Sequence, residues 1–209
     1  MAKHLAAIAG LVLALVAGGV SAELKEGSDY AKISPPQPSA AKIEVIEFFW
    51  YGCPHCHAFE PALSQWLKTL PKDVEFRRVP VDFGRWMPGV NLFYALDAIG
   101  EEQRLHGELF DAIHLEQMNF NSEAAVADWL AREGVDRRKF VDAYHSIAVR
   151  NNIRYAQQMS KDYGLNGVPA MAVGGRYLTS NVMAGGFDEL LIVVDQLIAM
   201  QRAERALQK

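Results

Sequence analysis

A predicted strand that leads directly into Cys53-Pro54-His55-Cys56 constrains this chain more than any other feature. Residues 43–50 form a continuous β-prone apolar run, which is typical of a strand buried on both faces of a parallel sheet. Pro54 suits the first turn of a helix, where its missing N–H costs nothing. The chain has no other cysteines, and a bridge across so short a loop would stabilise the fold by only about 2 kcal/mol. The pair therefore predicts redox chemistry instead of a structural disulfide.

The two cysteines are expected to differ in acidity. Cys53 precedes the helix, where free backbone N–H groups and the helix dipole favour an anion. His55 lies between the sulfurs and can add a positive charge or a hydrogen-bond donor. Cys56, one turn into the helix, should be more buried and keep a pKa nearer its normal value. We therefore predict Cys53 as the exposed attacking and leaving sulfur, and Cys56 as the resolving one.

The acidity of Cys53 determines the direction in which the pair exchanges electrons. Each pKa unit below the ambient pH stabilises the reduced pair by about 1.4 kcal/mol, equivalent to about 30 mV for a two-electron couple. A Cys53 pKa of about 4 would make the pair about 90 mV more oxidising at neutral pH. Such a protein would donate its disulfide to other dithiols.

Glu47 is an acid within the predicted buried strand. Burial disfavours the charged carboxylate, so the pKa of Glu47 should be raised and the side chain could take up or release a proton close to the cysteines. Alternatively, Glu47 pairs with a base, and Arg77 or Arg78 on the next predicted strand could provide it. Both interpretations remain open from the sequence.

The order of predicted elements is strand, helix, strand, helical block, hairpin and helix. Gly and Pro become sparse between residues 88 and 163, where apolar residues recur at helical spacing. Capping candidates at Asn121-Ser122-Glu123 and Asp136 mark helix starts there. This order predicts an α/β thioredoxin-like fold with an inserted all-helical domain. The predicted parts are a discontinuous thioredoxin-like domain at 23–87 and 164–209, with an extended lead-in at 23–41, and the inserted domain at 88–163.

Residues 1–22 have the pattern of a secretory signal peptide. A short polar start with Lys3 is followed by an apolar stretch and then by small residues up to Ala22. An uncleaved membrane anchor is the alternative, although the apolar stretch is short for a bilayer. We expect export to the periplasm, where disulfides persist. The formal charge of −4 gives no reason to expect a nucleic-acid surface.

Two segments together resemble the DsbA family of periplasmic thiol:disulfide oxidoreductases. They are residues 48–61, which contain Cys53-Pro54-His55-Cys56, and the distant Gly167-Val168-Pro169-Ala170. The resemblance implies a thioredoxin fold with a helical insertion and no cofactor. It also implies a strongly oxidising disulfide that is donated to reduced, unfolded exported proteins. Reoxidation would come from an inner-membrane partner of the DsbB type that passes electrons to quinone.

The resemblance also implies roles for individual residues. Cys53 would be the nucleophile and His55 would stabilise its thiolate. Pro169 would be a cis proline beside the sulfurs, and Val168 and Pro54 would contact substrate with it. A proline without a backbone donor leaves neighbouring groups free to pair with an extended substrate segment. An ordinary trans proline at a strand start is the alternative.

Three other functions fit parts of the sequence. Cys53 to His57 matches the C-x-x-C-H pattern of c-type haem attachment, which would make the chain an electron-transfer protein. A disulfide isomerase or reductase of the same fold is a second alternative. Only residues 23–42 precede the first predicted strand, which favours a monomeric oxidase. Zinc binding is the weakest alternative, because no second ligand pair lies at a fixed spacing. We therefore expect no metal.

Overall fold

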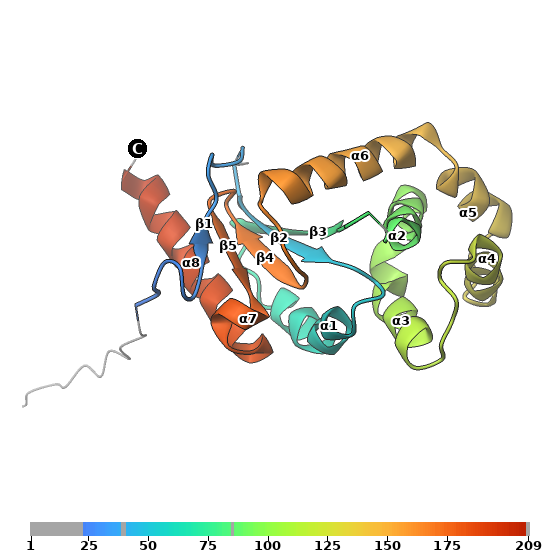
Figure 1. The fold of residues 1–209 in the computed structure, drawn as a ribbon, viewed down its shortest axis with the longest axis horizontal. Helices are drawn as coiled ribbons and strands as arrows, with labels where there is room; N and C mark the ends of the chain where they lie inside the picture. Colours follow the sequence, from blue (N-terminus) through green and yellow to red (C-terminus); the bar gives the residue numbers. More distant parts are fainter. Residues whose placement is uncertain (1–22, 39–40, 85, 208–209) are drawn as a thin grey trace, which may run out of the picture.

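The computed structural model describes residues 23–38, 41–84 and 86–207, and the predicted signal peptide lies outside them. The described part contains a five-stranded sheet with the order β1-β5-β4-β2-β3 (Figure 1). Strands β2 and β3 are parallel, and the other neighbours are antiparallel. The strands are β1 (Ala31–Lys32), β2 (Ile43–Phe49), β3 (Val74–Pro80), β4 (Ala170–Val173) and β5 (Tyr177–Ser180).

The two faces of the sheet are covered by different helices (Figure 1). Helices α1 (Pro54–Leu67) and α8 (Phe187–Leu207) pack on one face, where Val45 and Val173 share a core with Phe59 of α1. Helix α6 (Ile147–Asp162) lies over the opposite face, where Phe48 belongs to a second core. Because successive strand residues point to opposite faces, β2 contributes to both cores, as its continuous apolar sequence predicts.

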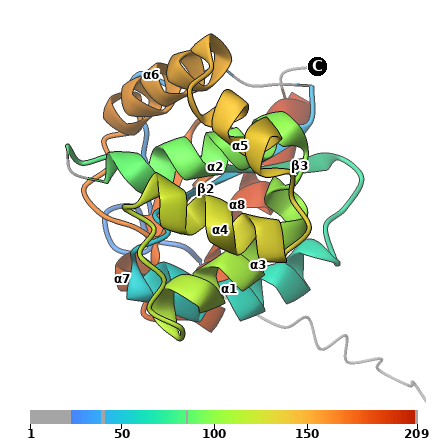
Figure 2. The ribbon, with the colours of Figure 1, turned by 90° about the vertical axis from the view of Figure 1, so that its right-hand side faces the viewer.

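Helices α2 to α6 lie between β3 and β4 in the sequence and form the helical insertion of the predicted fold. Figure 2 shows α2, α3 and α4 in front of the sheet. The predicted caps are confirmed, because Ser122 accepts from the N–H of Ala125 and Asp136 accepts from the N–H of Lys139. The remaining bounds are α2 (Met87–Ile99), α3 (Glu102–His114), α4 (Glu123–Arg132), α5 (Arg137–Tyr144) and the short α7 (Asn181–Ala184) after β5.

The N-terminal lead-in differs from the sequence-based expectation. The lead-in before β2 is not only extended chain, because β1 pairs Ala31 with Leu178 and closes one edge of the sheet. Helix α1 is one continuous helix from Pro54 to Leu67, with Pro61 inside it. Among the described residues, no helix is long and apolar enough to cross a membrane.

The predicted hairpin turn between β4 and β5 is confirmed. Gly174 and Gly175 have φ values of 58° and 66°, a region that glycine adopts without steric cost. A Cβ on Gly175 would also lie 2.5 Å from the carbonyl oxygen of Gln37. This turn returns the chain so that β5 pairs with β4. On its other side β4 pairs with β2, and the Val168–Pro169 segment that precedes β4 lies beside the cysteines.

Candidate active site

The two cysteines lie where β2 passes into α1. Cys53 is the N-cap residue, with extended backbone, and its carbonyl accepts the first bond of the helix from the N–H of His57. Both cysteines are free thiols. Cys53 is 8% exposed and Cys56 is completely buried. The expected difference in depth is therefore confirmed, but Cys53 is less exposed than predicted because the residues around it shield all but an edge of the sulfur.

The environment of Cys53 stabilises its thiolate and lowers its pKa to about 6. A hydrogen bond from the Cys56 thiol contributes most, and burial of the sulfur opposes it. Backbone N–H groups of Cys56 and His55 contribute next, as expected at a helix N-terminus. The charge of His55 contributes least among these causes, because the side chain is exposed. The sequence argument missed the donor role of Cys56.

Cys56 has the opposite environment. Burial raises the pKa of its thiol well above the ordinary value, and the nearby charges of Cys53 and Glu47 raise it further. The expectation of a nearly normal pKa for Cys56 is therefore wrong, because the sulfur is fully enclosed. At neutral pH this sulfur holds its proton, whereas Cys53 is mostly a thiolate. The effect of Glu47 also places that carboxylate within electrostatic range of the buried sulfur.

The Val168–Pro169 segment lies against the cysteine pair. The Val168–Pro169 peptide bond is cis, and the Cys53 thiol lies 3.6 Å from the Val168 carbonyl oxygen. Val168 and Pro169 line a groove of about 570 Å³. Pro54 does not reach this groove. It lines a separate hollow on the side of the helical insertion, together with Trp50, Gly52, Trp86, Ile113, His114, Phe120 and Asn121.

Glu47 is fully buried in β2, where it pairs with Arg78 and still has a raised pKa. Its Oε2 accepts a hydrogen bond from Arg78 Nε at 3.1 Å, whereas Arg77 pairs with Glu44. Burial nevertheless raises the pKa of Glu47 to about 7, because the attraction of Arg78 offsets only part of the desolvation. A carboxyl group with this pKa exchanges a proton readily at neutral pH.

Arg78 contacts further buried or partly buried groups that the sequence analysis missed. Glu60 of α1 accepts from Arg78 Nη2 at 3.0 Å, and Glu102 of α3 lies 3.7 Å from Arg78 Nη1. His106 of α3, 2% exposed, lies 3.5 Å from Glu60 and 3.3 Å from Glu102. These groups come from separate elements, so no local sequence signal could have grouped them. We call Glu47, Glu60, Arg78, Glu102 and His106 the buried charge cluster.

The cluster includes the one group of residues in the described ranges with the spacing of a metal site. Glu47, Glu60 and His106 place ligand atoms within 4.8 Å of one another. The Arg78 guanidinium already pairs with both carboxylates, and its positive charge would oppose a cation at the same place. Burial opposes ionisation of Glu60, but hydrogen bonds and charges from His106 and Arg78 outweigh it and lower the pKa of Glu60 to about 2. The arrangement favours proton exchange over metal binding.

The C-x-x-C-H pattern does not make a haem site in this fold. His57 Nε2 lies 2.7 Å from Asp111 Oδ1, and its ring stacks on His114 with centroids 4.8 Å apart. Cys56 has no exposed surface through which a porphyrin could be attached. His57 therefore connects α1 to α3 and is not available as an axial ligand.

Comparisons with known proteins agree with this geometry. A family model described as a DSBA-like thioredoxin domain matches residues 90–197. The thiol:disulfide interchange protein DsbA of Pseudomonas aeruginosa is 41% identical over 180 residues, which cover 85% of each chain. The protein of the same name from Bordetella pertussis is 45% identical over 177 residues, covering 83% of this chain and 84% of the relative.

Solved structures show the same likeness. The crystal structure of Pseudomonas aeruginosa DsbA matches with a TM-score of 0.82 at 41% identity, covering 88% of this chain and 96% of that one. The oxidoreductase DsbA from Xylella fastidiosa matches with a TM-score of 0.81 at 32% identity, covering 86% and 98%. From its sequence, its fold and the placement of its cysteines, the chain belongs to the DsbA family of thiol:disulfide oxidoreductases.

Proposed function

We propose that this oxidoreductase works as an oxidase in the periplasm, where it donates the Cys53–Cys56 disulfide to reduced, newly exported proteins. A DsbB-type quinone reductase of the inner membrane then reoxidises it, and the oxidase acts as a monomer. The signal-peptide pattern of residues 1–22 supports the location. The family membership supports the reaction, and the electrostatics of the cysteine pair support its direction.

The acidity of Cys53 is the observation that carries this proposal. Its pKa of about 6 lies below neutral pH, so the reduced protein gains stability from the thiolate that the disulfide form lacks. One pKa unit corresponds to about 1.4 kcal/mol, or about 30 mV toward a more oxidising pair. The direction agrees with the sequence argument, and the size is smaller than the illustrative value used there. The stabilised thiolate therefore favours donation of the disulfide.

Donation proceeds in two exchanges. A substrate thiolate attacks the Cys53 sulfur, the Cys53–Cys56 bond breaks, and Cys56 leaves as a thiolate that takes up a proton. A second substrate thiolate then attacks the substrate sulfur of the mixed disulfide. The substrate disulfide forms and Cys53 leaves as a stabilised thiolate. Two electrons pass from the substrate dithiol to the cysteine pair, and Cys53 is the better leaving group because its pKa is the lower of the two.

Glu47 supplies the proton that Cys56 needs. The carboxyl group lies within electrostatic range of Cys56, and its pKa of about 7 allows it to give a proton in one half of the cycle and accept it in the other. Arg78 holds the carboxylate in place through Glu47 Oε2 and leaves Oε1 without a hydrogen-bond partner. Glu47 is thus the proposed acid and base of the buried sulfur.

Substrate lies along the cis-proline segment. The groove beside Val168 and Pro169 can accept an extended chain next to Cys53, and Pro169 removes a backbone donor there. Pro54 is exposed on the other side of the sulfur and contacts the substrate from the helical insertion side. Unfolded chains suit such a site, because a reduced cysteine must reach a sulfur that is only 8% exposed.

Two measurements on the mature protein test the proposal. The first is the reduction potential against glutathione, together with the thiolate absorbance of Cys53 as a function of pH. We expect a thiolate that titrates near pH 6 and a potential more oxidising than that of a dithiol with unshifted pKa values. The second compares oxidation of a reduced peptide with recovery of scrambled ribonuclease. Efficient recovery with slow oxidation would make the protein an isomerase and reject the oxidase assignment.

A further inference from the structure

We propose that His106 and Glu102 carry protons between Glu47 and a cavity between the two parts of the fold, on a route separate from the surface where substrate docks. This inference rests on the proposed proton exchange between Glu47 and Cys56, and it identifies where that proton comes from and where it goes. The route uses the buried charge cluster defined above.

The need for a route follows from burial. Cys56 and Glu47 are both 0% exposed, and Glu60 is 7% exposed. Glu47 can hold one proton, so it must be recharged from water before the next turnover. A substrate protein bound over Cys53 covers the edge of the cysteine site that faces solvent. Protons must then enter or leave elsewhere.

The cluster offers a continuous set of polar contacts toward the helical insertion. Glu47 and Glu60 share Arg78, at 3.1 Å and 3.0 Å. His106 Nε2 lies 3.5 Å from Glu60 Oε2. On the other side of the ring, His106 Nδ1 lies 3.3 Å from Glu102 Oε1. His106 is therefore the group that connects the acids near the sulfur to the acid on α3.

Three buried atoms along this route have no hydrogen-bond partner. They are Glu47 Oε1, His106 Nε2 and Glu102 Oε1. Glu47, Glu60 and His106 each have a polar atom within 4.8 Å of the other two. A single bridging water spans a gap of that size. Proton transfer from one group to the next requires free lone pairs and ring N–H groups at such distances.

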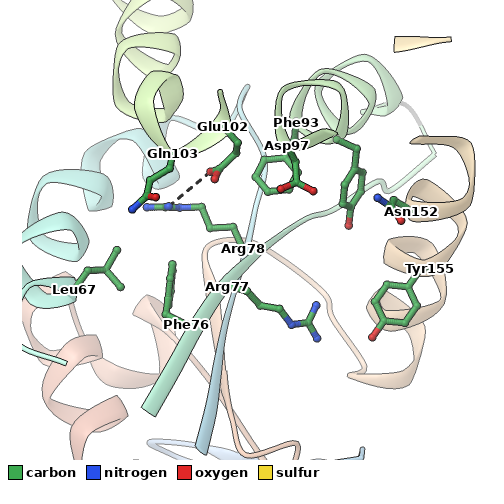
Figure 3. Close-up of a pocket in the computed structure, with 11 residues that line it drawn as sticks. Leu67, Phe76, Arg77, Arg78, Phe93, Asp97, Glu102, Gln103, Asn152 and Tyr155 are labelled. Atoms are coloured by element: carbon green, nitrogen blue, oxygen red, sulfur yellow. Dashed lines mark ion pairs between the residues drawn. The ribbon is translucent and has the colours of Figure 1, made fainter. Parts of the chain in front are cut away.

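The route ends at a cavity of about 600 Å³ between the thioredoxin-like part and the helical insertion. Arg78 and Glu102 line it, and Figure 3 shows their ion pair, with Asp97 near Glu102 and Tyr155 farther away. Glu102 is 17% exposed and so touches both solvent and His106. Neither Cys53 nor the Val168–Pro169 segment lines this cavity. A substrate on the cysteine site would leave it open.

His106 is faced by charged or titratable groups from every element around it. Glu47 approaches from β2, Glu60 from α1, Arg78 from β3 and Glu102 from its own helix, and the Tyr51 hydroxyl lies 3.0 Å from Nδ1. Burial raises the pKa of Tyr51 well above its usual value, and the pKa of Arg78 is also raised, so both keep their protons.

Of the remaining groups, one stays ionised and the others exchange the proton. Glu60, with its pKa of about 2, stays ionised and orients the His106 ring. Burial disfavours the imidazolium of His106, but the nearby carboxylates of Glu102 and Glu60 outweigh it and raise the pKa of His106. The pKa of Glu47 is about 7 and that of His106 is raised, so these are the two groups that pass the proton along the route. When Cys56 leaves as a thiolate, Glu47 gives it a proton and His106 then gives a proton to Glu47. A proton from the cavity then reprotonates His106 by way of Glu102.

The test uses His106→Gln and Glu102→Gln, which keep size and polarity but remove proton exchange. Single-turnover oxidation of a reduced peptide is followed over pH in H2O and in D2O. We expect each variant to be slowed about ten-fold with a larger solvent isotope effect, because proton supply becomes limiting. The thiolate titration of Cys53 should not change. Glu108→Gln, an exposed charge removed from the same helix, is the control and should match the parent protein.

Chemical rescue separates a relay from a structural role. His106→Ala should be slow, and added imidazole should restore its rate by entering from the cavity. Parent-like rates and isotope effects in His106→Gln and Glu102→Gln would overturn the route. If Glu47→Gln is slow while these two variants are not, the proton role of Glu47 survives and only the route is rejected. If Glu47→Gln itself is unaffected, the proposed function of Glu47 fails first.

Discussion

Cys53 and Cys56 are separated by one helical turn, yet their surroundings shift their acidities in opposite directions. At Cys53 the donors converge on the sulfur and lower its pKa to about 6. At Cys56 burial raises the pKa well above its ordinary value. The different surroundings of the two sulfurs thus assign one to leave as a thiolate and the other to need a proton.

The largest expected effect comes from removing the sulfur with the lowered pKa. Cys53→Ala should abolish oxidation of a reduced peptide, because Cys56, the other thiol of the chain, is completely buried. Cys56→Ala is the matched variant. It should lose turnover but still form a mixed disulfide through Cys53, which mass spectrometry detects. Normal turnover by Cys53→Ala would overturn the assigned roles of both cysteines.

Glu60→Gln tests how much a buried charge near Cys56 contributes to the stability of the fold. We expect a loss of about 3 kcal/mol in the free energy of unfolding at neutral pH, because Arg78 and His106 lose a charged partner. The folded-state pKa of about 2 lies below the reference value of 4.5, so this contribution is present above pH 4.5 and is lost as the pH falls toward 2. Urea unfolding over pH measures it. Glu75→Gln, exposed on β3, is the control, and equal losses in both variants would contradict the prediction.

Glu47→Gln should change how the free energy of unfolding depends on pH more than it changes the free energy of unfolding at any single pH. The folded-state pKa of about 7 lies above the reference value of 4.5, so the stabilisation is complete below pH 4.5 and is lost as the pH rises through 7. The shift corresponds to about 3 kcal/mol across that window, and Glu47→Gln should remove this slope. Glu44→Gln, on the same strand but paired with Arg77, should retain it. Identical pH profiles for Glu47→Gln and the parent would leave Glu47 without a titrating role.

The smallest effect is expected at His55. His55→Leu should raise the pKa of Cys53 by less than about one unit and make the pair less oxidising by less than about 30 mV. The backbone N–H groups and the Cys56 thiol, which contribute more, remain in the variant. Thiolate absorbance and the potential against glutathione measure both changes. If the pKa of Cys53 instead rises by several units, His55 is the main group that stabilises the thiolate, as the sequence alone suggested.

The fold was predictable because its signals are local. The apolar run of β2, the proline at the start of α1, the paired glycines of the hairpin and the caps Ser122 and Asp136 each act within a few residues. The edge strand β1 was missed, because a two-residue strand carries no periodicity and exists only through its pairing with β5.

The sequence alone determined the reacting atoms. It placed two thiols at a helix start, named the acid in the buried strand and marked the proline segment that meets them. Only the tertiary structure decided how strongly each group holds its proton. Acidity in a protein depends on burial and on charges within a few ångströms, and those neighbours come from β3, α1 and α3, which are far apart along the chain. Local sequence carries no record of such distances, so the buried charge cluster became visible only in the folded molecule.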